Sequence, residues 1–260
     1  SHLAFNTAIC CNTGNLMGLP YTLSPDRPKQ LGLVVLQSDE TLERDMRRLL
    51  PVDAEALVSR VASGTELDTQ MIAGMESRLT GAAELLPRGA QVSAVGYGCT
   101  SATAQIGAAR VAALIQAGVP TAHVTDPVTA LITACSALGI TRLGMITPYV
   151  ANISDQLRVV VEEAGISVAC FASFEEKMEA NVVRIAADAV HAAAVEMGQD
   201  QNCDAVFLSC TNLRTLDIID AIEREIDKPV LSSNQVLAWD MMRLAGITPP
   251  KNLPGRLWKA

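Results

Sequence analysis

Two cysteines, Cys99 and Cys210, occur in two copies of one local sequence pattern. Each follows a short apolar run (residues 92–97 and 205–208) and precedes a threonine, a further small polar residue and a segment typical of a helix. A parallel strand followed by a helix delivers the residue at its end to the carboxyl edge of the sheet, where open α/β folds bind ligands. Two thiols placed alike by two similar halves could face each other across one cleft. Opposed thiols can remove a proton from one face of a carbon and return a proton to the other face.

Four polar residues directly follow the two thiols: Thr100 and Ser101 in the first copy, and Thr211 and Asn212 in the second. A helix N-terminus at each position would lower the thiol pKa through its free amides and its dipole, and the same amides offer an anion site. A substrate carboxylate, and an enediolate formed from it, could therefore be held without arginine or lysine. This chemistry needs neither a metal nor an organic cofactor, and we expect neither.

Other candidate residues have structural interpretations that are about as good. Tyr149 comes directly after a predicted strand and Pro148, so its side chain can reach the cleft. Asp39 lies in the loop after the first predicted strand, where ligands bind in such folds, but it could equally cap a helix over residues 41–50. A cysteine at a strand end is often a small buried hydrophobic residue. We expect such structural roles for the cysteines outside the repeated pattern: Cys10, Cys11, Cys135, Cys170 and Cys203.

The alternation of apolar runs with helix-like segments predicts parallel sheets with right-handed crossovers. Strands are expected at residues 31–36, 54–61, 92–97, 121–124, 143–147, 167–171, 205–208 and 229–231. Helices are expected over residues 41–50, 68–85, 102–117, 127–138, 155–164, 182–197, 213–226 and 235–244. This order of strands and helices begins again near residue 143. The two Cys-Thr pairs are separated by almost the same number of residues as the two Leu-Gly pairs that begin at residues 31 and 143. We therefore predict an α/β fold of two pseudo-symmetric, Rossmann-like halves, each a mainly parallel sheet flanked by helices.

This reading divides the chain into three parts. Residues 1–30 show no sustained period and are expected to form an N-terminal arm that packs on the surface or on a partner subunit. Residues 31–125 form the first α/β half, completed by residues 232–260, and residues 126–231 form the second half. The apolar arm also favours a homo-oligomer, a dimer or higher.

The composition limits the possible partners and compartments. The chain has 260 residues, of which 49% are apolar and only 3% aromatic, which suits parallel strands buried under helices better than a β-sandwich. The net charge of −8 argues against nucleic acid or an anionic membrane as a partner. Seven cysteines without zinc-like spacing indicate a reducing, cytoplasmic compartment. No apolar run reaches the roughly 18 residues of a membrane helix, and no secretory leader opens the chain.

Three segments carry a resemblance to a known family: Gly98-Cys99-Thr100-Ser101, Ile146-Thr147-Pro148-Tyr149 and Leu208-Ser209-Cys210-Thr211. They resemble the aspartate/glutamate racemase superfamily, most closely its branch of maleate cis–trans isomerase, arylmalonate decarboxylase and the related ectoine-utilization proteins. The resemblance runs from about Gly32 to Gly246. It implies two α/β halves with the active site between them, and it makes Cys99 and Cys210 the catalytic thiols of the first and second half. It also matches Tyr149 to a substrate-binding tyrosine and Asn181 to a substrate-binding asparagine of the isomerase.

Two comparisons within this branch bear on the substrate. The decarboxylase has glycine at the first thiol position, so the presence of Cys99 favours the racemases and isomerases that use two thiols. The isomerase has asparagine in the loop after the first strand, where this chain has Asp39. A carboxylate there would repel a second substrate carboxylate, which argues against maleate and favours a substrate with an ammonium, amide or hydroxyl group at that end.

Three functions are compatible with these observations. The first is a cofactor-independent racemase or isomerase of a small carboxylate that uses Cys99 and Cys210. The second is a cofactor-independent decarboxylase of a substituted malonate, with Cys210 as the proton donor. The third is a non-catalytic protein that binds a small carboxylate, for which paired thiols would have little use.

Overall fold

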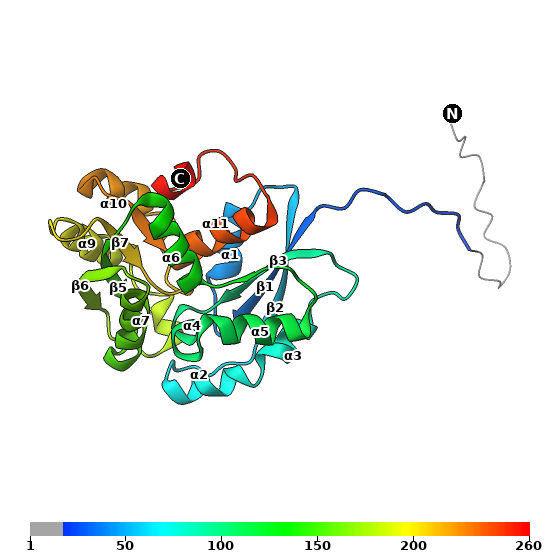
Figure 1. Cartoon of the computed structure of the whole chain (residues 1–260), viewed down its shortest axis with the longest axis horizontal. Helices are drawn as coiled ribbons and strands as arrows, with labels where there is room; N and C mark the ends of the chain where they lie inside the picture. Colours follow the sequence, from blue (N-terminus) through cyan, green and yellow to red (C-terminus); the bar gives the residue numbers. More distant parts are fainter. Residues whose placement is uncertain (1–17) are drawn as a thin grey trace.

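A computed structural model describes residues 18–260 and contains two parallel β-sheets of four strands each (Figure 1). The first sheet comprises β1 (Lys29–Leu36), β2 (Ala54–Val61), β3 (Val92–Gly98) and β4 (Val124–Thr125). The second comprises β5 (Arg142–Thr147), β6 (Ser167–Ser173), β7 (Ala205–Leu208) and β8 (Val230–Ser232). The strand orders, β2-β1-β3-β4 and β6-β5-β7-β8, are equivalent between the halves. This repeated topology confirms the predicted α/β fold with two pseudo-symmetric halves.

Helices cover the sheets and bury their central strands. In order along the chain they are α1 (Leu42–Leu49), α2 (Thr69–Glu76), α3 (Leu79–Glu84), α4 (Thr100–Ile106), α5 (Ala108–Gly118), α6 (Pro127–Leu138), α7 (Ala151–Glu163), α8 (Glu179–Val182), α9 (Ala187–Gly198), α10 (Ile219–Ile226) and α11 (Ser233–Ala245), followed by a 3₁₀ turn (Arg256–Lys259). The inner strands β1, β3, β5 and β7 are almost entirely buried, whereas most residues of the edge strands β2 and β6 are half-buried or exposed. Continuous apolar runs therefore mark the inner strands, as parallel sheets with two covered faces require.

The C-terminal helix returns to the first sheet. Helix α11 packs against β3 and β1 and also against α6 (Figure 1). The division in which residues 232–260 complete the first half stays a prediction.

Several predicted helices differ from the observed ones. The helix expected over residues 68–85 is interrupted between α2 and α3, and the helix expected over 102–117 is interrupted between α4 and α5. The second break lies at Gly107, whose φ of +95° is a conformation that residues with a Cβ rarely adopt. The helices expected over 182–197 and 213–226 begin later, at α9 and α10.

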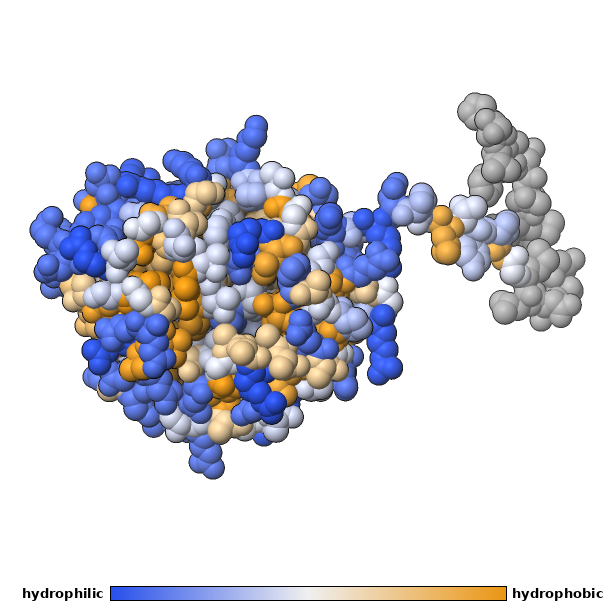
Figure 2. Space-filling view, in the orientation of Figure 1, coloured by the Kyte–Doolittle hydropathy of each residue, from blue (hydrophilic) through white to orange (hydrophobic). Residues whose placement is uncertain are grey.

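The N-terminal segment is described only in part. Residues 1–17, which include Cys10, Cys11 and most of the predicted arm, lie outside the described residues. Residues 18–28 form no helix or strand, and the segment extends away from the body (Figure 1, Figure 2). Near its end, the Arg27 guanidinium donates a hydrogen bond to the Gly89 carbonyl at 2.9 Å. Strand β1 begins at Lys29, so the arm ends two residues earlier than predicted. Within the described part of the chain, no helix has both the length and the apolar character needed to cross a membrane.

Candidate active site

The two cysteines of the repeated pattern lie at equivalent edges of the two sheets. Cys99 follows β3 and is the N-cap of α4, where its Sγ accepts a hydrogen bond from the Ala102 amide at 3.4 Å. Cys210 comes two residues after the end of β7, and its φ is +106°. β3 and β7 occupy the same position in their two sheets, so the cysteines are equivalently placed in the two halves.

Both thiols line one small cavity, together with most of the polar residues singled out in the sequence. Its wall consists of Leu36, Asp39, Leu67, Cys99, Thr100, Ser101, Tyr149, Glu179, Cys210 and Thr211. The volume of about 10 Å³ accommodates one water molecule at most. A substrate of several carbon atoms therefore enters only when the wall moves.

Hydroxyl groups surround the thiols and are held by hydrogen bonds. Ser101 Oγ lies 3.5 Å from Cys99 Sγ, and Tyr149 Oη lies 3.2 Å from Ser209 Oγ. Thr100 Oγ1 lies 2.8 Å from Ser233 Oγ, which also accepts the Cys210 amide at 2.9 Å. The first residue of α11, which the sequence analysis did not single out, thus ties the two cysteine-bearing segments together.

Asp39 caps a helix and also lines the cavity. Its Oδ1 accepts the amides of Thr41 and Leu42 at 2.8 and 2.7 Å, so it caps the start of α1. Its Oδ2 accepts a hydrogen bond from Thr211 Oγ1 at 2.8 Å, across the boundary between the halves. The same carboxylate therefore stabilises a helix and forms part of the cavity wall.

Asn181 and Asn212 do not line the cavity. Asn181 is exposed, and its Nδ2 donates to Glu176 Oε2 at 3.1 Å. Asn212 is buried behind the wall, where its Nδ2 donates to Glu179 Oε2 at 2.8 Å and its Oδ1 accepts the Glu40 amide at 2.9 Å. The structure therefore places Glu179, rather than Asn181, in the cavity, and no local sequence pattern distinguished Glu179.

The segment after Cys210 is a turn rather than the start of a helix. Residues 211–218 precede α10, and the first two of them are held by tertiary hydrogen bonds. Thr211 binds Asp39, and Asn212 binds Glu179 and Glu40. These partners lie on other segments of the chain, so they fix the backbone in a path that a helix would not follow.

Burial raises the pKa of both thiols, contrary to the expected lowering by helix starts. The pKa of Cys99 is raised to about 12, with only partial compensation from the hydroxyl of Ser101 and the amide of Ala102. Burial and the charge of Glu179 raise the pKa of Cys210 well above its usual value. The expectation failed because the cost of removing a thiolate from water exceeds the gain from one helix turn, and because no helix follows Cys210. The closed site therefore holds both cysteines as neutral thiols at neutral pH.

The two carboxyl groups of the cavity are also perturbed by burial. The pKa of Glu179 is raised from 4.5 to about 7 by burial, with a further increase from the charge of Asp39 and a decrease from the hydrogen bond of Asn212. Burial likewise raises the pKa of Asp39, against the hydrogen bonds that its carboxylate accepts. Among residues 18–260 no group of three or more histidine, cysteine, aspartate or glutamate side chains could hold a metal ion.

Two loops beside the cavity are joined across the two halves, and Leu67 of the first loop lines the cavity. They are residues 62–68, after β2, and residues 174–178, before α8. Glu66 and Met178 form an antiparallel bridge, and Lys177 forms an ion pair with Glu66 at 3.1 Å. The Leu67 amide donates a hydrogen bond to the Lys177 carbonyl at 2.9 Å, and the Glu179 amide donates one to the Thr65 carbonyl at 3.0 Å. Because Leu67 and Glu179 line the cavity, these contacts hold it closed.

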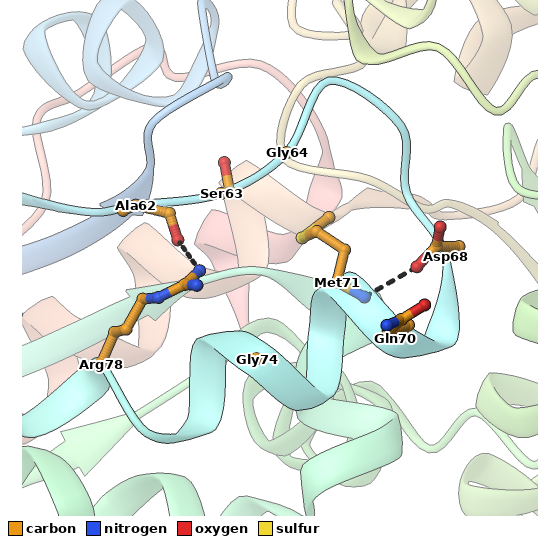
Figure 3. Close-up of a pocket in the computed structure, with 8 residues that line it drawn as sticks. All are labelled: Ala62, Ser63, Gly64, Asp68, Gln70, Met71, Gly74 and Arg78. Carbon is orange, nitrogen blue, oxygen red and sulfur yellow. Dashed lines mark hydrogen bonds between the residues drawn. The ribbon is translucent and has the colours of Figure 1, made fainter.

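A larger hollow lies outside this site, over α2 (Figure 3). Its volume is about 780 Å³, and it is lined by Ala62, Ser63, Gly64, Asp68, Gln70, Met71, Gly74 and Arg78. Both of its charged side chains are hydrogen-bonded to the backbone (Figure 3): Asp68 accepts a hydrogen bond from the Met71 amide, and Arg78 donates one to the Ala62 carbonyl. The wall of this hollow has no thiol and no free polar cluster, so its size does not make it the candidate active site.

Comparisons with known proteins agree with the fold. A family model described as arylmalonate decarboxylase matches residues 51–258. The arylmalonate decarboxylase of Bordetella bronchiseptica is 30% identical over 222 residues, which cover 83% of this chain and 90% of that protein. The maleate isomerase of Nocardia farcinica is 24% identical over 238 residues, which cover 87% of this chain and 93% of that protein.

Solved structures with the same fold include members of both groups. The maleate isomerase Iso of Pseudomonas putida S16, in a cysteine-to-alanine variant with maleate, superposes with a TM-score of 0.79 at 22% identity, covering 89% of this chain and 98% of that chain. A liganded variant of arylmalonate decarboxylase, with one glycine changed to cysteine and one cysteine to serine, gives a TM-score of 0.78 at 25% identity, covering 88% and 98%.

Proposed function

Because this chain belongs to the family of arylmalonate decarboxylase and maleate isomerase, within the aspartate/glutamate racemase superfamily, we propose that it is a cofactor-independent isomerase or racemase of a small carboxylate. The observation that carries this proposal is that Cys99 and Cys210 line the same cavity, one from each half. Relatives in this family are cofactor-independent isomerases or decarboxylases, so thiols and hydroxyls suffice for such chemistry.

In the proposed reaction the thiols share the proton transfers. One cysteine, as thiolate, takes the proton from the substrate carbon, and the other cysteine, as thiol, delivers a proton to the opposite face. The hydroxyls of Thr100, Ser101 and Tyr149 donate hydrogen bonds to the substrate carboxylate and to the enediolate that forms from it. Since both cysteines are neutral in the closed, empty cavity, the thiolate must form as the substrate enters, and the thiol loses its proton to solvent while the wall is open.

A decarboxylase of a substituted malonate is the second candidate, because the matching family model and the relative at 30% identity are both arylmalonate decarboxylases. In that reaction Cys210 would protonate the enediolate left after loss of carbon dioxide. Cys99 makes this candidate weaker, since a thiol occupies wall space that an aryl substituent would need. A binding protein without activity ranks third, because its function would not require two thiols in one cavity.

Proton NMR in D₂O with a panel of small acids tests the proposal. The panel contains maleate, aspartate, 2-amino and 2-hydroxy acids, and phenylmalonate. Deuterium at Cα without loss of carbon indicates a racemase, and fumarate from maleate indicates an isomerase. Release of carbon dioxide with deuterium in the product would instead establish the decarboxylase. Binding without any turnover across amino, hydroxy and dicarboxylic acids would favour the binding protein.

A further inference from the structure

The charges around the cavity are unbalanced. Its wall carries two carboxyl groups, Asp39 and Glu179, and includes no lysine, arginine or histidine among the residues that the structure describes. Arg60 comes close to Asp39, but its guanidinium binds the Asp39 and Leu36 carbonyls, at 2.9 and 3.0 Å, and the Glu43 carboxylate. No cation on the wall itself therefore compensates the two acids.

Glu179 is oriented so that one carboxyl oxygen is available. Asn212 Nδ2 donates to Oε2 at 2.8 Å and to the Glu179 carbonyl at 3.1 Å, which fixes the side chain. The Oε1 atom has no hydrogen-bond partner within residues 18–260, and Glu179 lines the cavity. Asp39 lies near enough that its charge raises the pKa of Glu179.

We propose that Glu179 and Asp39 form a receptor for a cationic group, so that the substrate is a small acid with an ammonium group rather than a dicarboxylate. This inference rests on the proposed function of the same cavity, which supplies the carboxylate end of the substrate. An ammonium group provides the missing positive charge and donates hydrogen bonds to Glu179 Oε1. A second carboxylate at that position would face two like charges in a site from which water is excluded.

A cationic substrate would also activate the thiols. Burial and the charges of Glu179 and Asp39 disfavour the thiolate forms of Cys99 and Cys210. A positive charge beside the two carboxylates offsets their negative charge and lowers the thiol pKa, since an opposite charge favours the ionised form of a thiol. Binding of the cation therefore favours release of a thiol proton to solvent, so substrate binding and formation of the thiolate are coupled.

Calorimetric titration with matched pairs of acids tests the receptor. The pairs are β-alanine with malonate and 4-aminobutyrate with succinate, which differ only in the group at the far end. At pH 8 we expect the ammonium member of at least one pair to bind tenfold or more tightly than its dicarboxylate. Glu179→Gln, which keeps an acceptor for Asn212, should abolish or reverse this preference. Glu175→Gln is the matched control, because Glu175 is an exposed glutamate of the same segment.

Equal binding of both members, tighter binding of the dicarboxylates, or no binding of either ammonium acid up to its solubility limit would overturn the inference. A preference that survives Glu179→Gln would overturn it as well.

Should that variant not fold, the pH dependence of the binding preference of the wild-type protein tests the same inference. The preference should fall at least threefold from pH 8 to pH 5.5, as Glu179 takes up its proton. The other titratable groups that face the cavity are Asp39, Cys99, Cys210 and Tyr149, of which the thiols and the phenol stay neutral over this range. Because binding is measured here, its failure is distinct from the failure of the D₂O exchange that tests the activity.

Discussion

Replacement of Glu179 by glutamine should make the protein more stable at pH 8 while changing its stability little at pH 4.5. Glu179 is 5% exposed, and burial raises the pKa of its carboxyl group from 4.5 to about 7. An acid whose pKa is higher in the folded chain contributes stability that is fully present below the unfolded pKa and is lost as the pH rises through the folded pKa. Glutamine has the same shape and no charge, so the variant avoids this loss.

The expected magnitude follows from the two pKa values. The interval from 4.5 to about 7 corresponds to about 3 kcal/mol, at about 1.4 kcal/mol for each pH unit. Between pH 5 and pH 8 the difference in the free energy of unfolding between variant and wild type should therefore grow by about 2–3 kcal/mol. Burial also raises the pKa of Asp39 and Asp45, but these groups are present in both proteins and their effects largely cancel.

Urea unfolding followed by circular dichroism at pH 5, 6, 7 and 8 measures this difference. The exposed Glu175→Gln variant should follow the wild type at every pH. A difference between Glu179→Gln and wild type that stays constant from pH 5 to pH 8 would refute the reasoning, because the burial of Glu179 would then not disfavour its charge. A stabilised variant with weakened ligand binding would show that the buried acid is kept for function at a cost in stability.

Three further outcomes are expected. Cys99→Ser and Cys210→Ser should each lower turnover at least about a hundredfold in a steady-state assay, and full activity of Cys99→Ser would exclude a mechanism with two thiols. Gly118→Ala should destabilise the protein by about 1–3 kcal/mol in thermal unfolding, because its new Cβ would lie 2.8 Å from the Ala83 Cβ of the adjacent helix. The control variant Gly81→Ala, whose Cβ would enter open space, should stabilise the protein by about 0.5–1 kcal/mol. Lys177→Glu places like charges where the two loops are joined, which favours the open wall that admits substrate, so it should lower KM severalfold and leave kcat nearly unchanged. An unchanged KM would show that the joined loops do not control entry.

Elements with strong local signals were predictable from the sequence. The predicted bounds of β2, α6 and β7 agree with the structure. Helix α6 illustrates the reason, since Asp126 caps its start, Pro127 occupies the first turn and Gly139 ends it in a left-handed conformation. The break at Gly107 was missed because the surrounding alanine-rich sequence has the composition of one continuous helix.

The position of the thiols was also encoded locally. Each cysteine lies within two residues of the end of an apolar strand, and the sheet topology carries such residues to the carboxyl edge of each sheet. The same signal, a position just after a predicted strand, picked out four further residues that line the cavity: Thr100, Ser101, Tyr149 and Thr211. It could not find Glu179, because that residue reaches the cavity only through contacts of Asn212 and of the loop at Thr65, which lie far from it along the chain.

The sequence by itself therefore determined the two-half α/β fold and the pair of cysteines at its sheet edges, because apolar periodicity and strand-end position are properties of short segments. Only the tertiary structure decided the protonation states of these groups. Whether a thiol or carboxyl group is charged depends on how completely other segments exclude water from it and on which charges they bring near. That is why Cys99 and Cys210 are neutral thiols where the sequence predicted activated ones, and why Glu179 is an acid with a pKa of about 7.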